Sequence, residues 1–83
     1  MNPEDYRNLY KKISEIVNEI DPGYYNGPPD EYDFQVRGII QLIERREISN
    51  LRALVKLFFG QRENISSVEK ENMKRIMEQV RLL

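Results

Sequence analysis

The chain contains neither cysteine nor histidine among its 83 residues. Without cysteine it can form no disulfide and offers no thiolate ligand for zinc. Without histidine it lacks the commonest general base and the Ser–His and Cys–His pairs that activate nucleophiles. Most enzyme classes are thereby excluded, so the sequence predicts a protein that is not an enzyme and that carries no cofactor and no metal.

Long apolar runs are absent as well. No segment approaches the ~20 apolar residues that a helix needs to cross a bilayer. The first residues also lack the basic stretch followed by an apolar one that marks a secretory signal. We therefore expect a cytoplasmic protein that does not bind a membrane.

The length suits a single domain spanning residues 1–83, close to the lower size limit for a self-sufficient core. Hydrophobic residues at 40% and charged residues at 33% are typical of a chain that folds rather than of a disordered one. In the absence of disulfides, stability has to come from core packing or from self-association. A homo-oligomer is therefore compatible with this composition.

Charge is unevenly distributed, although the formal net charge is only -1. Residues 1–33 carry eight acidic and three basic side chains, a net charge of -5, whereas residues 34–83 carry ten basic and six acidic side chains, a net charge of +4. Two interpretations follow: the halves attract each other within one molecule, or the acidic half docks a basic partner. The small net charge gives no drive toward nucleic acid.

Apolar residues recur at helical spacing in four segments, which predict helices over about 3–20, 33–43, 51–59 and 67–83. No segment alternates apolar and polar residues in the manner of a strand. The expected caps are Asn2, Asp33, either Ser49 or Asn50, and Ser66, which forms a capping box with Glu69. The fold class is accordingly all-α, a compact bundle of about four helices.

Two features of these helices predict their packing. Gly38 lies in the middle of the second helix, where glycine costs roughly 1 kcal/mol against alanine, so we expect a neighbouring helix to approach closely there. The 51–59 segment is apolar around most of its circumference. It is therefore either the central helix of the core, which is the favoured interpretation, or part of a subunit interface.

The loop at 21–33, rich in proline, glycine, tyrosine and acidic residues, is the distinctive segment. Its prolines and glycines prevent regular structure. For Tyr32 we expect a buried ring whose hydroxyl bonds to loop carbonyls or carboxylates. We expect the four residues Tyr24, Tyr25, Asp30 and Glu31 to bind a protein partner with a basic surface. The alternative is that the loop is only a rigid structural lid.

Two other functions stay open at this level. Asp30, Glu31 and Asp33 could serve a small carboxylate-dependent, metal-binding enzyme, although the loop does not have the spacing of an EF-hand. The basic residues Arg45, Arg46, Arg52 and Lys56 could contact DNA weakly, but the acidic Glu44 and Glu47 lie among them.

A resemblance rests on Asp21-Pro22, then Pro28-Pro29-Asp30-Glu31-Tyr32-Asp33, then Val36 and Ile39-Ile40. In these residues the chain resembles a family of small helical bacterial proteins of unknown function. The pattern of an Asp-Pro loop leading into Asp-Glu-Tyr-Asp at a helix start is also similar to that of some immunity proteins of bacterial toxin systems. The resemblance covers roughly residues 20–43. The resemblance implies a compact helical fold, a cytoplasmic location and no established enzymatic activity, and it assigns no catalytic residue. We therefore expect a non-catalytic interaction protein of immunity or regulatory type.

Overall fold

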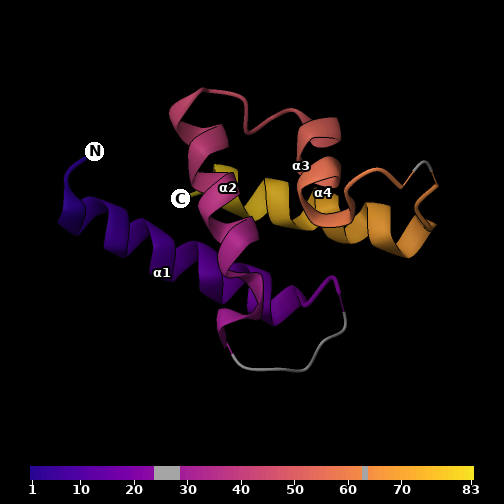
Figure 1. The fold of residues 1–83 in the computed structure, drawn as a ribbon, viewed down its shortest axis with the longest axis horizontal. Helices are drawn as coiled ribbons and strands as arrows, with labels where there is room; N and C mark the ends of the chain where they lie inside the picture. The colour runs from indigo at the N-terminus through magenta and orange to yellow at the C-terminus, as the bar shows by residue number, and fades with distance from the viewer. Residues whose placement is uncertain (24–28, 63) are drawn as a thin grey trace.

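A computed structural model describes residues 1–23, 29–62 and 64–83. Of residues 29 and 30 it describes the backbone alone. It contains four α-helices, α1 (Pro3–Ile20), α2 (Asp33–Glu44), α3 (Leu51–Phe59) and α4 (Ser67–Arg81), and a short 3-10 helix, η1 (Pro29–Tyr32), that leads into α2 (Figure 1). No strand occurs in the described ranges. The predicted all-α bundle of four helices is confirmed.

The helices contact one another in a closed order. α1 packs on α2 and α4, while α3 packs on the same two helices. η1 lies against both α1 and α2, and the α2–α3 pair stands above α1 in the view of Figure 1. In the part of the chain that the structure describes, no helix is long and apolar enough to cross a membrane.

The core is built from the stripes that the helical spacing predicts. Its buried members are apolar, and within α1, α2 and α4 they recur at spacings of three or four residues. They are Ile13 and Val17 of α1, Val36, Ile39 and Ile40 of α2, Leu54 of α3, and Met73, Ile76 and Val80 of α4, with Tyr32 at the end of η1. Each such side chain contributes about 1.5–3 kcal/mol by leaving water.

Three of the predicted helix starts are confirmed at the level of the capping atoms. Asn2 accepts a hydrogen bond from the Asp5 backbone N–H at 2.8 Å. Asn50, rather than Ser49, caps α3 by accepting from the Ala53 N–H at 3.2 Å. The capping box that opens α4 is complete. These caps satisfy backbone N–H groups that the first turn of a helix leaves without partners.

The predicted cap of α2 is wrong. Tyr32 occupies the N-cap position without a side-chain cap bond, because η1 runs directly into the helix, and Asp33 is the first helical residue. The Asp33 carboxylate instead accepts a hydrogen bond from the Tyr10 hydroxyl of α1. It also forms an ion pair with Arg37, at 3.1 Å. Asp33 therefore joins two helices, and its negative charge still lies at the positive end of the α2 dipole.

The contact between Asp33 and Tyr10 changes the pH at which Tyr10 ionises. The hydrogen bond to Asp33 raises the pKa of the Tyr10 hydroxyl from 10.0 to about 12. The pKa is higher in the folded protein, so the contribution to stability is complete below pH 10 and is lost as the pH rises toward 12. In a spectrophotometric titration, Tyr10→Phe should remove one tyrosine that ionises near pH 12, and Asp33→Asn should lower the pKa of Tyr10. A titration curve above pH 10 that neither variant changes would contradict this assignment.

α3 differs from the favoured expectation for it. Only Leu54 is fully buried on this helix, while Leu51, Val55, Leu57, Phe58 and Phe59 pack against the core from its edge. α3 is therefore not the central helix. The apolar circumference reflects a helix that contacts α2 and α4 on two sides and keeps part of its apolar surface open.

The predicted close approach at Gly38 is confirmed. A Cβ atom built on Gly38 would overlap the side chain of Leu57, so glycine lets α3 lie tightly against α2 at this point. The same contact brings the outer face of α2 beside α3.

Candidate functional site

The structure describes only some of the side chains of the four predicted partner-binding residues. Tyr24 and Tyr25 lie outside the described residues, as does the side chain of Asp30. Glu31 is exposed on η1. A binding role for these four residues therefore stays a prediction.

Other parts of the loop act as scaffold. The ring of Tyr32 is only 3% exposed. Its hydroxyl donates to Asp21 Oδ1 at 2.5 Å and accepts from the Gly23 N–H at 2.7 Å. Asp21 itself caps the carboxyl end of α1 in the left-handed conformation, with φ of 49°. The expected burial and internal bonding of Tyr32 are thus confirmed, and two of the loop's four carboxylates, Asp21 and Asp33, are used inside the fold.

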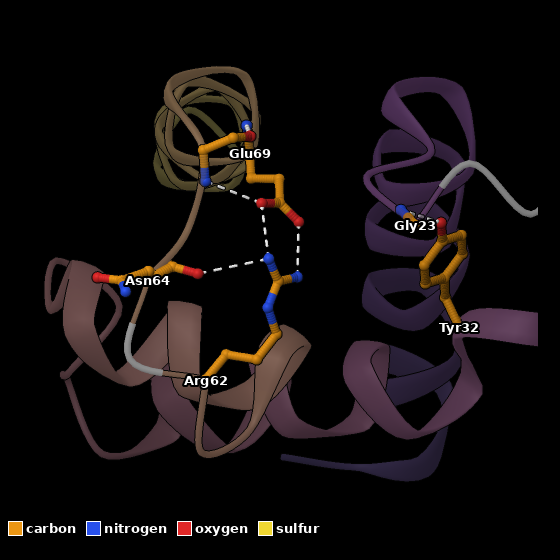
Figure 2. Close-up of polar contacts among 6 residues, drawn as sticks. Gly23, Tyr32, Arg62, Asn64 and Glu69 are labelled. Carbon is orange, nitrogen blue, oxygen red and sulfur yellow. Dashed lines mark hydrogen bonds and ion pairs between the residues drawn. The ribbon is translucent and has the colours of Figure 1, made fainter.

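A pocket of about 320 Å³ opens where the end of α1, the start of α2, the end of α3 and the start of α4 meet. Its lining consists of three aromatic rings, one ion pair, one amide and a turn, namely Tyr32, Phe58, Phe59, the pair Arg62 and Glu69, Gln35, and Pro22–Gly23. Tyr32 and Phe58 make a tilted ring contact with centroids 6.2 Å apart. Figure 2 shows the ion pair on one side of the pocket, with Tyr32 and Gly23 opposite.

The charges of this pocket are already matched. Arg62 donates to Glu69 from both terminal guanidinium nitrogens, at 2.8 and 3.1 Å, and its guanidinium carbon lies 5.3 Å from the centre of the Phe59 ring. Glu69 also accepts from the Ser66 N–H at 2.8 Å (Figure 2). The Arg62 pair and that N–H lower the pKa of the Glu69 carboxyl to about 2. These bonds hold the α3–α4 connection in place, which is a structural task.

One polar atom beside this pocket is unpaired. Gln35 Oε1 is buried and has no hydrogen-bond partner among the described residues. The side chain as a whole is only partly buried. Arg62 and Glu69 neutralise each other, so among the described residues the pocket has no group that selects a charged ligand and no arrangement of acid and base for catalysis.

A second hollow, of about 290 Å³, lies on the outer side of α2 and α3. Its floor is apolar and its rim is basic. Gly38, Leu42, Ala53 and Leu57 form the floor, Arg45 and Lys56 form the rim with Gln41, and Phe34 lies at one end. We call this surface the α2–α3 groove. Phe34 is 72% exposed.

The opposite flank of α3 has a related character. A shallow hollow of about 410 Å³ there has an apolar floor of Leu51, Val55 and Ile65, with Arg52 and Lys70 at its edge. Among the described residues, the linings of the two hollows together contain four cationic side chains and no acidic one. The exposed side of α3 is therefore apolar and basic together. Sequence reasoning noted the basic residues but not their placement beside open apolar surface.

Of the alternative carboxylate site, the structure describes the side chains of Glu31 and Asp33 but not that of Asp30. Asp33 is engaged by Tyr10 and Arg37, while Glu31 is exposed. Across the described ranges no three acidic side chains are close enough together to hold a metal ion. Comparisons with family models, curated proteins and solved structures found no match to this chain.

Proposed function

We propose that this chain is a non-catalytic protein-interaction domain whose partner binds on the face formed by α2 and α3. The observation that carries the proposal is the α2–α3 groove itself. An exposed phenylalanine and the open side of a strongly apolar helix border the same hollow. A single exposed apolar residue is ordinary, but contiguous apolar surface with a polar rim is typical of interaction sites.

The composition of the groove fits protein binding better than catalysis. Aromatic residues and arginine are enriched in the centres of protein interfaces, where they supply most of the affinity. Phe34 and Arg45 stand at the two ends of the groove on α2. The pocket beside Tyr32, by comparison, offers only charges that are paired with each other.

Parts of the sequence-based hypothesis extend this proposal. The loop residues Tyr24, Tyr25, Asp30 and Glu31 would form a second contact region, and the exposure of Glu31 is the observation that supports it. An immunity or regulatory role in the bacterial cytoplasm rests on the resemblance at 20–43. An adjacent toxin gene would favour immunity.

Site-specific photo-crosslinking in the cells that express the protein tests the proposal. We expect p-benzoylphenylalanine in place of Phe34 to give a discrete cross-linked product. The same probe in place of Lys12, which is exposed on α1, should give none. A product from the probe at Glu31 would place the loop at the interface as well. Equal cross-linking from positions 34 and 12, or none from 34, would contradict the proposal.

A further inference from the structure

The α2–α3 groove has a shape and a charge that identify one kind of occupant. We propose that the segment it binds is an acidic amphipathic helix of a partner protein. This inference rests on the proposed function and adds the chemistry of the partner. Its elements are the apolar floor, the two basic side chains on the rim and the exposed Phe34.

The groove has the length of a short helix. On its α2 side the groove is lined by Phe34, Gly38, Gln41 and Arg45, which are spaced i, i+4, i+7 and i+11 and so lie on one face of that helix and its C-cap. At 1.5 Å per residue this face is about 16 Å long, or about three helical turns. On its α3 side the groove is lined by Ala53, Lys56 and Leu57. A helix that lies along such a groove contacts it through apolar residues at the same spacings.

The basic side chains on the rim have no ion-pair partner among the described residues. Within those residues the ion pairs are Arg37 with Asp33 and Arg62 with Glu69. Arg45 and Lys56 belong to neither pair, and no acidic side chain in the described ranges lines the groove. Acidic residues flanking the apolar stripe of a bound helix would complement these charges and raise the association rate.

A second copy of this chain fits the groove less well. A symmetric dimer brings the same patch against itself, so the rims of Arg45 and Lys56 would face each other and repel. A head-to-tail contact between the basic groove and the acidic half of another copy would build rings or open filaments of many copies. A partner of different sequence avoids both problems.

Nucleic acid also fits less well. Binding of a phosphate backbone needs several cations on one face, and an apolar floor contributes nothing to it. Here two cations border a floor made of Gly38, Ala53 and two leucine side chains, in a chain whose net charge is -1. The surface favours apolar contact framed by charge, which is how amphipathic helices are recognised.

Three synthetic peptides test the proposal against the intact chain. Each has about 15 residues, enough for an isolated helix to begin to form, and carries leucines at i, i+4, i+7 and i+11. The remaining positions are mainly glutamate, glutamine or lysine in the three versions. In fluorescence anisotropy titrations we expect the glutamate peptide to bind at least about tenfold more tightly than the glutamine peptide. The lysine peptide should bind most weakly.

Variants locate the binding. Lys56→Glu and Phe34→Ala should each weaken binding of the glutamate peptide by about tenfold. Lys12→Glu, the same charge reversal on the exposed side of α1, should leave the affinity within about twofold. Circular dichroism melts should show that all three variants fold. A loss of affinity with Lys12→Glu equal to that with Lys56→Glu would overturn the assignment to the groove.

Other results would also overturn the inference. Absence of glutamate-peptide binding, or equal affinity for all three peptides, would exclude an acidic helix as the ligand. A DNA duplex that binds more tightly than the glutamate peptide, with a steep loss of affinity in salt, would indicate nucleic acid instead. Sedimentation showing a dimer that Lys56→Glu dissociates would indicate a second copy. If the probe at position 34 cross-links a partner while the peptides fail, the interaction function stands and only the partner chemistry is wrong.

Discussion

Replacing Leu54 with alanine is expected to lower the free energy of unfolding by about 3 kcal/mol. Leu54 is the one fully buried side chain of α3, and it packs in the core shared by all four helices. Truncation leaves a cavity that the surrounding side chains fill only in part. A domain of this size has a total stability on the order of 5 kcal/mol, so the variant should be marginally folded at best. Urea denaturation followed by far-ultraviolet circular dichroism measures the change.

Leu82 provides the matched control for this substitution. The same leucine-to-alanine change is made there on a side chain that is 82% exposed, just after α4. We expect Leu82→Ala to change stability by less than about 0.5 kcal/mol. Equal losses for the two variants would mean that α3 is not anchored through Leu54. A loss confined to Leu54→Ala would confirm that one side chain fixes the helix that forms a wall of the groove.

Structural features were predicted correctly from the sequence where the residues that decide them are close together in the chain. The caps at Asn2, Asn50 and Ser66 involve partners three residues away, and the apolar stripes need only the helical repeat. The helix ends at residues 20 and 59 follow from the Asp-Pro and glycine residues that come directly after them. Such features were predicted correctly because no distant contact competes with them.

Predictions were wrong where a distant residue decides the outcome. Asp33 was expected to cap α2, but its carboxylate is taken by the hydroxyl of Tyr10, 23 positions away along the chain. The favoured central position of α3 failed for a related reason. Apolar content alone does not specify how many neighbours a helix has, and α3 is covered on two sides by α2 and α4 but left open between them.

The groove illustrates the same limit at the candidate site. Phe34 could have been assigned to the outer face, because at 100° per residue it lies opposite the stripe of Val36, Ile39 and Ile40. The α3 side of the groove could not have been assigned from the sequence, because it depends on the close contact of Gly38 with Leu57 that sets the position of α3. The outer face of α2 therefore becomes a groove only through a tertiary contact.

Replacing Tyr32 with alanine is expected to be as damaging, with a loss of about 4 kcal/mol. Its ring packs on Phe58 of α3, and its hydroxyl bonds to Asp21 and Gly23 after α1, so one side chain joins the segments on both sides of the loop. Alanine removes the ring and leaves buried polar groups without that hydroxyl. Thermal melting should show a fall of more than about 15 °C, since each kcal/mol shifts a domain of this size by about 4–8 °C.

Two further variants distinguish the contributions of the Tyr32 ring and hydroxyl from that of a nearby exposed ring. Tyr32→Phe keeps the ring and should cost about 1–2 kcal/mol, the share due to the hydroxyl bonds. Phe34→Ala removes an aromatic ring two residues away that is 72% exposed, and we expect a change below about 0.5 kcal/mol. A small effect of Tyr32→Ala would mean that the loop is held by other contacts. If Tyr32→Ala lowers the free energy of unfolding strongly and Phe34→Ala leaves it unchanged, the two aromatic residues have different roles. Tyr32 then stabilises the fold, and Phe34 is free to bind a partner.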